Sequence, residues 1–162
     1  MTMLTPRLEE LGVECGRLLR ERGETVGIAE GSAGGLISAS LLAVPGASAY
    51  YLGGSVVYTR AAVQAFIAGP VEQPAKLRGA TEAFATYLAA SVAAQLGATW
   101  GLSEAGAAGP PNPYGDPAGH CWIAVAGPTS TARNVLTGVD DRPRNMVAFA
   151  VAALELLAEE LA

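Results

Sequence analysis

Few side chains in this sequence could act as nitrogen bases. Nine of the ten basic residues are Arg, the tenth is Lys76, and the single histidine is His120. An arginine guanidinium is not deprotonated in proteins, so only Lys76 and His120 are available for this role. A serine nucleophile needs a base beside it. Acyl-transfer chemistry would therefore depend on one of these two side chains or on a carboxylate such as Glu30.

The glycine-rich segment GSAGG, residues 31–35, is a candidate ligand site. A Gly/Ser turn between a strand and a helix exposes backbone N–H groups at the positive end of the helix dipole, where phosphate or carboxylate is stabilised. In a purely structural reading the glycines only allow close helix packing, and the turn alone favours this reading because it lacks the dinucleotide and Walker A spacings. Glu30, beside the turn, is as likely to be a cap or a solvated side chain as a catalytic acid. The candidate ligand-binding residues here are Glu30, Ser32, Gly34 and Gly35.

A second candidate is the turn-rich segment GAAGPPNPYGDPAG, residues 106–119. Long loops of this kind are often functional in compact domains, although a plain connection between strands is an equal alternative. His120 follows it directly, and a satisfied histidine at a strand edge is the simpler interpretation of that residue. Further along, DDRPR (140–144) could direct Arg142 or Arg144 toward a phosphate, with a solvated helix start as the alternative.

Strands alternating with helices must position these segments. This order, followed by a hairpin, predicts a three-layer α/β/α sandwich with a mixed, mostly parallel sheet. Thr5 and Pro6 predict the start of the first helix, and Thr81 caps a later one. The expected helices cover 6–21, 36–44, 61–69, a segment after Thr81 and 142–161, and the expected strands cover 25–29, 55–59, 99–105, 120–126 and 132–138.

Length and composition restrict the class of protein. With 162 residues we expect one domain, residues 1–162, and the net charge of −5 argues against nucleic-acid binding. No apolar run reaches the roughly 20 residues of a membrane span, and the N-terminus resembles no secretion signal, so we expect a cytoplasmic protein that does not bind membranes. Cys15 and Cys121 read as reduced core residues. We expect neither a metal site nor a cofactor.

Five motifs in one order resemble the CinA C-terminal domain family, whose characterised members are nicotinamide-nucleotide amidohydrolases. These enzymes convert nicotinamide mononucleotide to nicotinate mononucleotide and ammonia. The family typically shows AESCTGG, VPGSS, GGVVTYSNEAK, GIAGP and KPVGTV. The corresponding segments here are AEGSAGG (29–35), VPGAS (44–48), GGSVVYTRAAV (53–63), GAAGP (106–110) and DPAGHC (116–121).

The resemblance also shows where this chain departs from the family. It implies a Ser nucleophile served by Lys and Tyr, and a first Ser in the glycine-rich turn that assists. Ser48 and Tyr58 match, but Gly31 stands in place of the first Ser and Val63 in place of the catalytic Lys. By the same pattern the glycine-rich turn, Ser48, Tyr58 and the 106–119 loop, with Gly106 and Gly109, would face one pocket.

Three functions follow from this pattern. The first is a degenerate relative, a pseudoenzyme that binds a pyridine-nucleotide-like small molecule and has lost most deamidase activity. The second is an active amidohydrolase in which Ser48 attacks and Tyr58 or the substitute base His120 moves the proton. The third is a non-catalytic interaction or regulatory module. We expect a homo-oligomer.

Overall fold

The computed structural model describes residues 2–162, and its first helix follows the predicted signals closely. Helix α1 (Pro6–Arg22) begins after Thr5, whose side chain accepts a hydrogen bond from the N–H of Leu8. It ends at Gly23, which has φ of 64° and donates its N–H to the last turn. A left-handed residue at this position closes the helix, and glycine adopts that conformation without a steric penalty.

The centre of the molecule is a five-stranded mixed sheet in the order β2-β1-β3-β4-β5. β1 pairs in parallel with β2 on one side and with β3 on the other. β4 is antiparallel to β3, and β5 is antiparallel to β4, which confirms the predicted hairpin. The strands are β1 (Val26–Glu30), β2 (Tyr51–Val56), β3 (Trp100–Ala107), β4 (His120–Ala126) and β5 (Ser130–Leu136).

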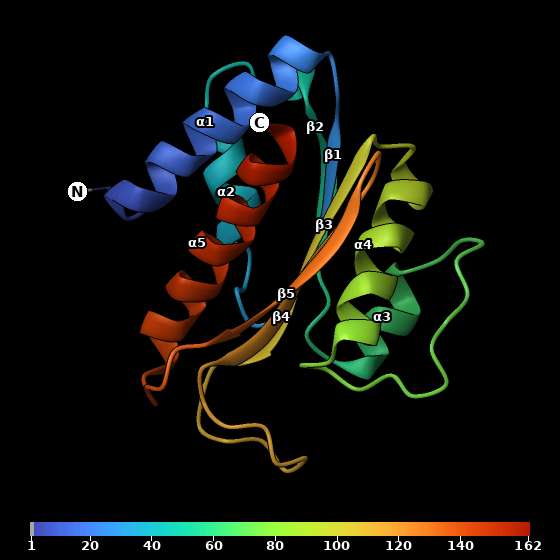
Figure 1. Cartoon of the computed structure of the whole chain (residues 1–162), viewed down its shortest axis with the longest axis vertical. Helices are drawn as coiled ribbons and strands as arrows, with labels where there is room; N and C mark the ends of the chain where they lie inside the picture. The colour runs from blue at the N-terminus through green and yellow to red at the C-terminus, as the bar shows by residue number, and fades with distance from the viewer. Residues whose placement is uncertain (1) are drawn as a thin grey trace.

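Helices cover both faces of this sheet and give the predicted three-layer α/β/α sandwich. Figure 1 shows α1, α2 and α5 on one face and α3 and α4 on the other. None of the helices in the described part of the chain is long and apolar enough to cross a membrane. The remaining helices are α2 (Leu36–Leu42), the short 3-10 helix η1 (Ala47–Ala49), α3 (Arg60–Phe66), α4 (Glu82–Leu96) and α5 (Arg142–Leu161).

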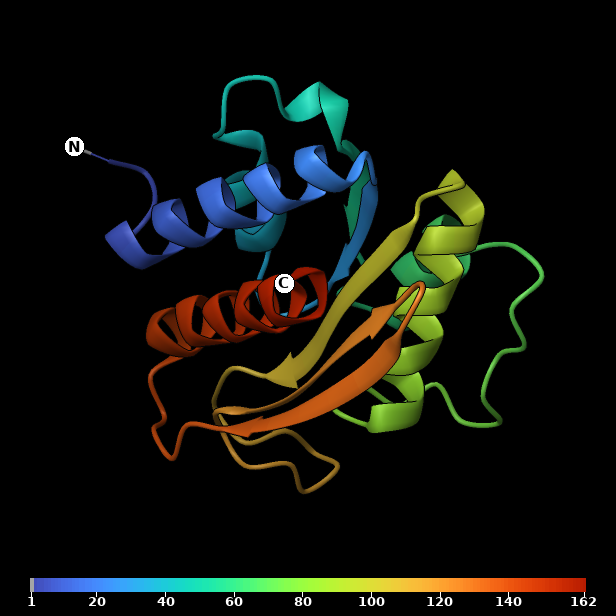
Figure 2. The ribbon, with the colours of Figure 1, turned by 45° about the horizontal axis from the view of Figure 1, so that its top comes forward.

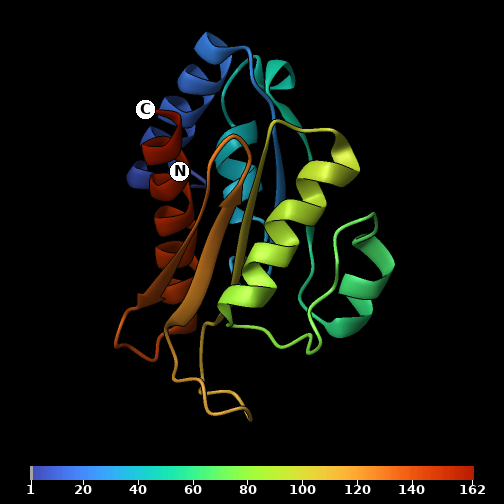
Figure 3. The ribbon, with the colours of Figure 1, turned by 45° about the vertical axis from the view of Figure 1, so that its right-hand side comes forward.

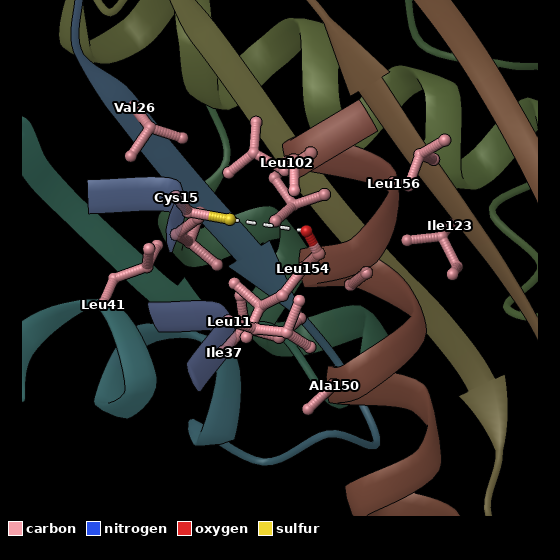
Figure 4. Packing of buried hydrophobic residues seen from close by; sticks show 14 of the residues in the cluster. Leu11, Cys15, Val26, Ile37, Leu41, Leu102, Ile123, Ala150, Leu154 and Leu156 are labelled. Carbon is pink, nitrogen blue, oxygen red and sulfur yellow. Dashed lines mark hydrogen bonds between the residues drawn. The ribbon is translucent and has the colours of Figure 1, made fainter. Parts of the chain in front are cut away.

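The larger hydrophobic core lies between the sheet and helices α1, α2 and α5, as Figure 4 shows. Cys15 is fully buried there, and its thiol donates a hydrogen bond to the Leu154 carbonyl at 3.4 Å. Burial raises the pKa of Cys15 to about 12. Cys121 is also buried, and both cysteines are free thiols, as expected.

The structure departs from the prediction at the second strand, which begins at Tyr51 rather than at residue 55. Gly53 and Gly54 are poor strand formers, so the sequence predicted a loop there. Pairing with β1 overrides that weak local preference. At the other candidate segment β3 continues to Ala107, and the irregular loop is therefore shorter than predicted, residues 108–119.

Candidate active site

Glu30 acts as the cap of helix α2. Its side chain is fully buried, and its carboxylate accepts hydrogen bonds from the backbone N–H groups of Gly35, Ile37 and Ser38 at 2.8, 3.1 and 3.0 Å. Three orphan donors at the positive end of the helix are thereby satisfied within the chain. Of the alternatives for Glu30, which were a cap, a solvated side chain and a catalytic acid, the structure therefore matches the cap.

A second buried carboxylate, Glu104 on β3, holds the first half of the glycine-rich turn. It accepts hydrogen bonds from the N–H groups of Gly31 and Ala33 at 3.1 and 2.8 Å and from the Ser32 hydroxyl at 2.6 Å. Burial raises the pKa of Glu104, and the Ser32 hydrogen bond opposes that rise. Glu104 was not among the site residues predicted from the sequence. The available signal was one acidic residue within the otherwise uncharged strand WGLSEAGA.

The conformation of the turn depends on its glycines. Gly34 and Gly35 have φ of 68° and 100°, values that side chains rarely tolerate. At Gly31, in contrast, a Cβ atom would meet only an ordinary contact, 3.4 Å from the Glu104 carbonyl oxygen. Position 31 therefore has room for a side chain, whereas the next two glycines are required by the backbone.

A cavity of about 550 Å³ opens at the carboxyl ends of the parallel strands. β1 lies between β2 and β3, so the chain passes from β1 outward to β2 and then crosses back to β3 on the other side of β1. Open α/β sheets bind ligands at the carboxyl ends of the strands where the strand order reverses in this way. The cavity brings together four predicted site residues, namely Tyr58, Gly106, Gly109 and Arg142. Its other lining residues are Thr59, Arg60, Leu77, Gly79, Ala107, Ala108, Pro110, Asn112 and Tyr114.

Arg142 fixes the geometry of one cavity wall. Its guanidinium donates hydrogen bonds to the Tyr58 hydroxyl at 2.7 Å and to the Gly109 carbonyl at 2.5 Å. It also lies over the Tyr58 ring, 5.8 Å from the centroid. Arg60 is the other charged residue of the lining, and no acidic residue is found among the lining residues that the structure describes. The cavity thus concentrates positive charge in a chain whose net charge is −5.

Ser48 lies away from this cavity. It is an exposed residue of η1, before the first residue of β2, whereas Tyr58 follows the last. The six residues of β2, at about 3.3 Å each, separate the two by roughly 20 Å. Figure 2 shows η1 at the end of the sheet opposite the 108–119 loop. Within one chain the structure does not bring Ser48 and Tyr58 together.

Val63 is part of a second apolar cluster rather than of the cavity. It lies on α3, is 3% exposed, and packs among apolar residues of β1, α4 and β3. The position at which the family resemblance places a Lys is therefore filled by close hydrophobic packing.

His120 is on β4 and does not line the cavity. Its Nδ1 lies 3.3 Å from an Asp116 carboxylate oxygen, and its Nε2 lies 2.7 Å from the amide nitrogen of Asn134. Asp116 also receives a hydrogen bond from Arg78 at 3.3 Å, so this group ties the 108–119 loop to the connection before α4. Lys76, the other nitrogen base, is exposed on that connection.

Comparison with known proteins gives one consistent family. The model of the CinA C-terminal domain matches residues 8–161. A CinA-like protein from Frankia casuarinae is 40% identical over 146 residues, which is 90% of this chain and 34% of the relative. A putative competence-damage inducible protein from Desulforamulus reducens is 36% identical over 75% of this chain and 29% of the relative. The chain thus spans about a third of the length of these curated relatives.

Solved structures show the same fold. The competence damage-inducible protein A (ComA) from Klebsiella pneumoniae superposes with a TM-score of 0.86 at 26% identity, covering 95% of this chain and 96% of that one. The competence/damage inducible protein CihA from Agrobacterium tumefaciens gives a TM-score of 0.88 at 24% identity, covering 98% of both chains.

Proposed function

Because the chain belongs to the CinA C-terminal domain family, we propose that it is a ligand-binding relative of the nicotinamide-nucleotide amidohydrolases whose deamidase activity is lost or strongly reduced. The observation on which this proposal chiefly rests is the cavity at the carboxyl ends of the strands, which has groups for anion recognition, while its described lining contains no Ser, Cys, Lys, His or acidic residue.

The charge and the size of the cavity support binding of a small anionic ligand. Arg142 and Arg60 offer guanidinium groups suited to a phosphate, and the backbone of residues 106–110 lines the same space. A volume of about 550 Å³ falls within the range of small-molecule sites. A pyridine nucleotide, which has one phosphate and a flat ring, fits this chemistry, with the Tyr58 and Tyr114 rings available for stacking.

The loss of chemistry rests on three positions. Gly31 has no hydroxyl, Val63 is closed into apolar packing, and Ser48 lies at the opposite end of β2 from Tyr58. A serine hydroxyl without an adjacent base is a poor nucleophile, and loss of a general base commonly costs about 10²–10⁴-fold in rate. The carboxylates of Glu30 and Glu104 are occupied by backbone N–H groups of the turn and its helix.

Two measurements on one protein preparation test ligand binding and the loss of deamidase activity. We expect no ammonia release from nicotinamide mononucleotide above the background rate, together with a rise in melting temperature when the same nucleotide is added. Arg142→Ala should abolish that rise, because it removes one charged wall of the cavity. Arg144→Ala is the matched control, since Arg144 is an exposed residue of the same helix that does not line the cavity.

The alternatives predict different results. Ammonia release that disappears in Ser48→Ala or His120→Ala would overturn the proposal in favour of an active amidohydrolase with a substitute base. Neither turnover nor stabilisation by the nucleotide, with a stable complex of another protein, would favour an interaction module.

A further inference from the structure

Two irregular segments form part of the cavity wall. One is the connection between α3 and α4, residues 67–81, and the other is the 108–119 loop. Figure 3 shows both at the same end of the sheet, where the connection leads into the start of α4 and the loop projects beyond the strands. The connection supplies Leu77 and Gly79 to the lining, and the loop supplies Tyr114 among others. The shape of this wall therefore depends on how the two segments are held together.

Arg78 links the two segments, although it is not among the described residues that line the cavity. Its guanidinium donates hydrogen bonds to the Tyr114 carbonyl at 3.1 Å and to the Asp116 carboxylate at 3.3 Å. The guanidinium carbon also lies over the Tyr114 ring, 5.7 Å from the centroid. One side chain from the connection thus contacts the ring, the backbone and a carboxylate of the loop.

The loop holds its own backbone near Tyr114. The Asp116 side chain is 8% exposed, and it accepts a hydrogen bond from the Asn112 amide at 2.7 Å. The side-chain oxygen of Asn112 accepts the N–H groups of Tyr114 and Asp116, at 3.0 Å each. The Tyr114 ring, in contrast, is 70% exposed. The backbone is therefore fixed within the loop, whereas the ring is restrained by the guanidinium of Arg78.

The cavity contains a second arginine–tyrosine pair, Arg142 over the Tyr58 ring. A tyrosine ring that has a cation against it and is otherwise open can stack on a flat ligand ring. The two pairs differ in one respect, because Arg142 lines the cavity and Arg78 does not. Removal of Arg78 therefore changes the setting of one ring and leaves both cations of the lining in place.

We propose that Arg78 is a positioning residue for ligand binding, which holds the Tyr114 ring as a stacking surface for the aromatic part of the ligand. This inference rests on the proposed function and assigns a subsite for the ring within it. A side chain that is already restrained loses less conformational freedom when a ligand binds. Without Arg78 the ligand itself would have to immobilise the exposed ring of Tyr114. The affinity then falls for ligands that have an aromatic ring and not for those that lack one.

Two ligands that share a sugar phosphate separate this role from a general effect on the cavity. Calorimetry would compare nicotinamide mononucleotide with ribose 5-phosphate, which has no aromatic ring. We expect Arg78→Gln to weaken binding of the nucleotide about three- to tenfold, the cost of immobilising one side chain, and to leave binding of ribose 5-phosphate unchanged. Circular dichroism would verify that the variant is folded at the assay temperature.

Arg133→Gln is the matched control. The Arg133 side chain is 40% exposed, as is that of Arg78, and it is ion-paired with Glu159 on α5 rather than with a residue of the cavity wall. This variant should leave the affinity for both ligands unchanged.

Tyr114→Ala completes a double-mutant cycle. It should weaken nucleotide binding about tenfold, because stacking on an aromatic side chain is lost. Arg78→Gln should cause no further loss in that background, since it acts through the Tyr114 ring. Chymotrypsin gives a readout that needs no ligand, and we expect faster cleavage after Tyr114 in Arg78→Gln than in wild type.

The outcomes distinguish this inference from the proposed function. Nucleotide affinity unchanged in Arg78→Gln, an equal loss for both ligands, or additive losses in the double variant would overturn the role of Arg78 and leave the proposed function intact. Wild-type protein that binds neither ligand would overturn the proposed function, and the ring subsite with it.

Discussion

Replacing Glu104 tests how the glycine-rich turn is held in place. In Glu104→Ala the N–H group of Ala33 and the hydroxyl of Ser32 lose their acceptor in a fully buried site, whereas the N–H of Gly31 keeps the Glu104 backbone carbonyl at 2.9 Å. Each buried donor left unsatisfied costs about 1–3 kcal/mol, so with two such donors we expect a loss of about 2 kcal/mol or more in the free energy of unfolding. This is a large fraction of the roughly 5–15 kcal/mol of a typical domain.

Glu104→Gln keeps the size of the side chain and changes only its hydrogen-bonding groups, so it separates the effect of lost volume from the effect of lost hydrogen bonds. Glutamine retains one acceptor oxygen but turns an amide group toward at least one of the donors. We expect a smaller loss, about 1–3 kcal/mol, which corresponds to a fall in melting temperature of roughly 2–12 °C for a domain of this size. Urea unfolding monitored by circular dichroism measures both variants. Glu10→Gln is the control, because Glu10 is exposed and its replacement should change stability by less than about 0.5 kcal/mol.

The stability should also depend on pH with a definite sign. Burial raises the pKa of Glu104 in the folded protein above its value in the unfolded chain. The folded state therefore binds the proton more tightly, and this contribution to stability is complete below the unfolded pKa and is lost as the pH rises through the folded pKa. The difference in stability between wild type and Glu104→Gln should shrink across that interval. A difference that grows with pH, or a Glu104→Ala variant as stable as wild type, would refute the assignment.

Two further predictions concern packing. Gly12→Ala should destabilise the protein by about 1–3 kcal/mol in urea unfolding, because the new Cβ would overlap the backbone carbonyl of Ser40 where α1 crosses α2. Gly79→Ala, where nothing lies within 4 Å of the new atom, should be nearly neutral, and equal effects would contradict the close approach. The thiol of Cys15 has a pKa of about 12 and is buried. A thiol reagent should therefore modify it only as fast as the protein unfolds, and not at the much higher rate of an exposed cysteine. Rapid labelling of the native protein would show that the site is not closed.

The starts of two helices could be predicted from sequence because their signals are local. The side chains of Thr5 and Thr81 cap α1 and α4, where the predicted helix starts require them. The beginning of β2 could not be predicted, because its two central glycines owe their strand conformation to pairing with β1. In that pairing Tyr51 lies opposite Val26, which is 25 residues earlier in the sequence. The strand preferences of the residues within a segment do not indicate which other strand it will pair with.

The candidate site shows the same limit. Arg142 and Tyr58 could be named from sequence, but not the hydrogen bond between them, which joins residues 84 positions apart. Glu104 was missed because the turn suggested an external anion, whereas β3 supplies an internal one. Ser48 was placed beside Tyr58 by the family pattern alone, and the length of β2 separates them within one chain.

Gly31 and Val63, two of the positions where this chain departs from the motifs typical of the family, differ in how easily they could accept the side chain that the family pattern has there. The Cβ atom of a serine at Gly31 would meet only ordinary contacts, the nearest being the Glu104 carbonyl oxygen at 3.4 Å. Val63 contributes its methyl groups to an apolar cluster, and a lysine there would have to place an ammonium group among them or displace α3. The backbone around Gly31 thus leaves room for a Cβ, whereas a lysine at position 63 would require its neighbours to change as well. The hydrophobic packing around α3 makes position 63 the less tolerant of the two.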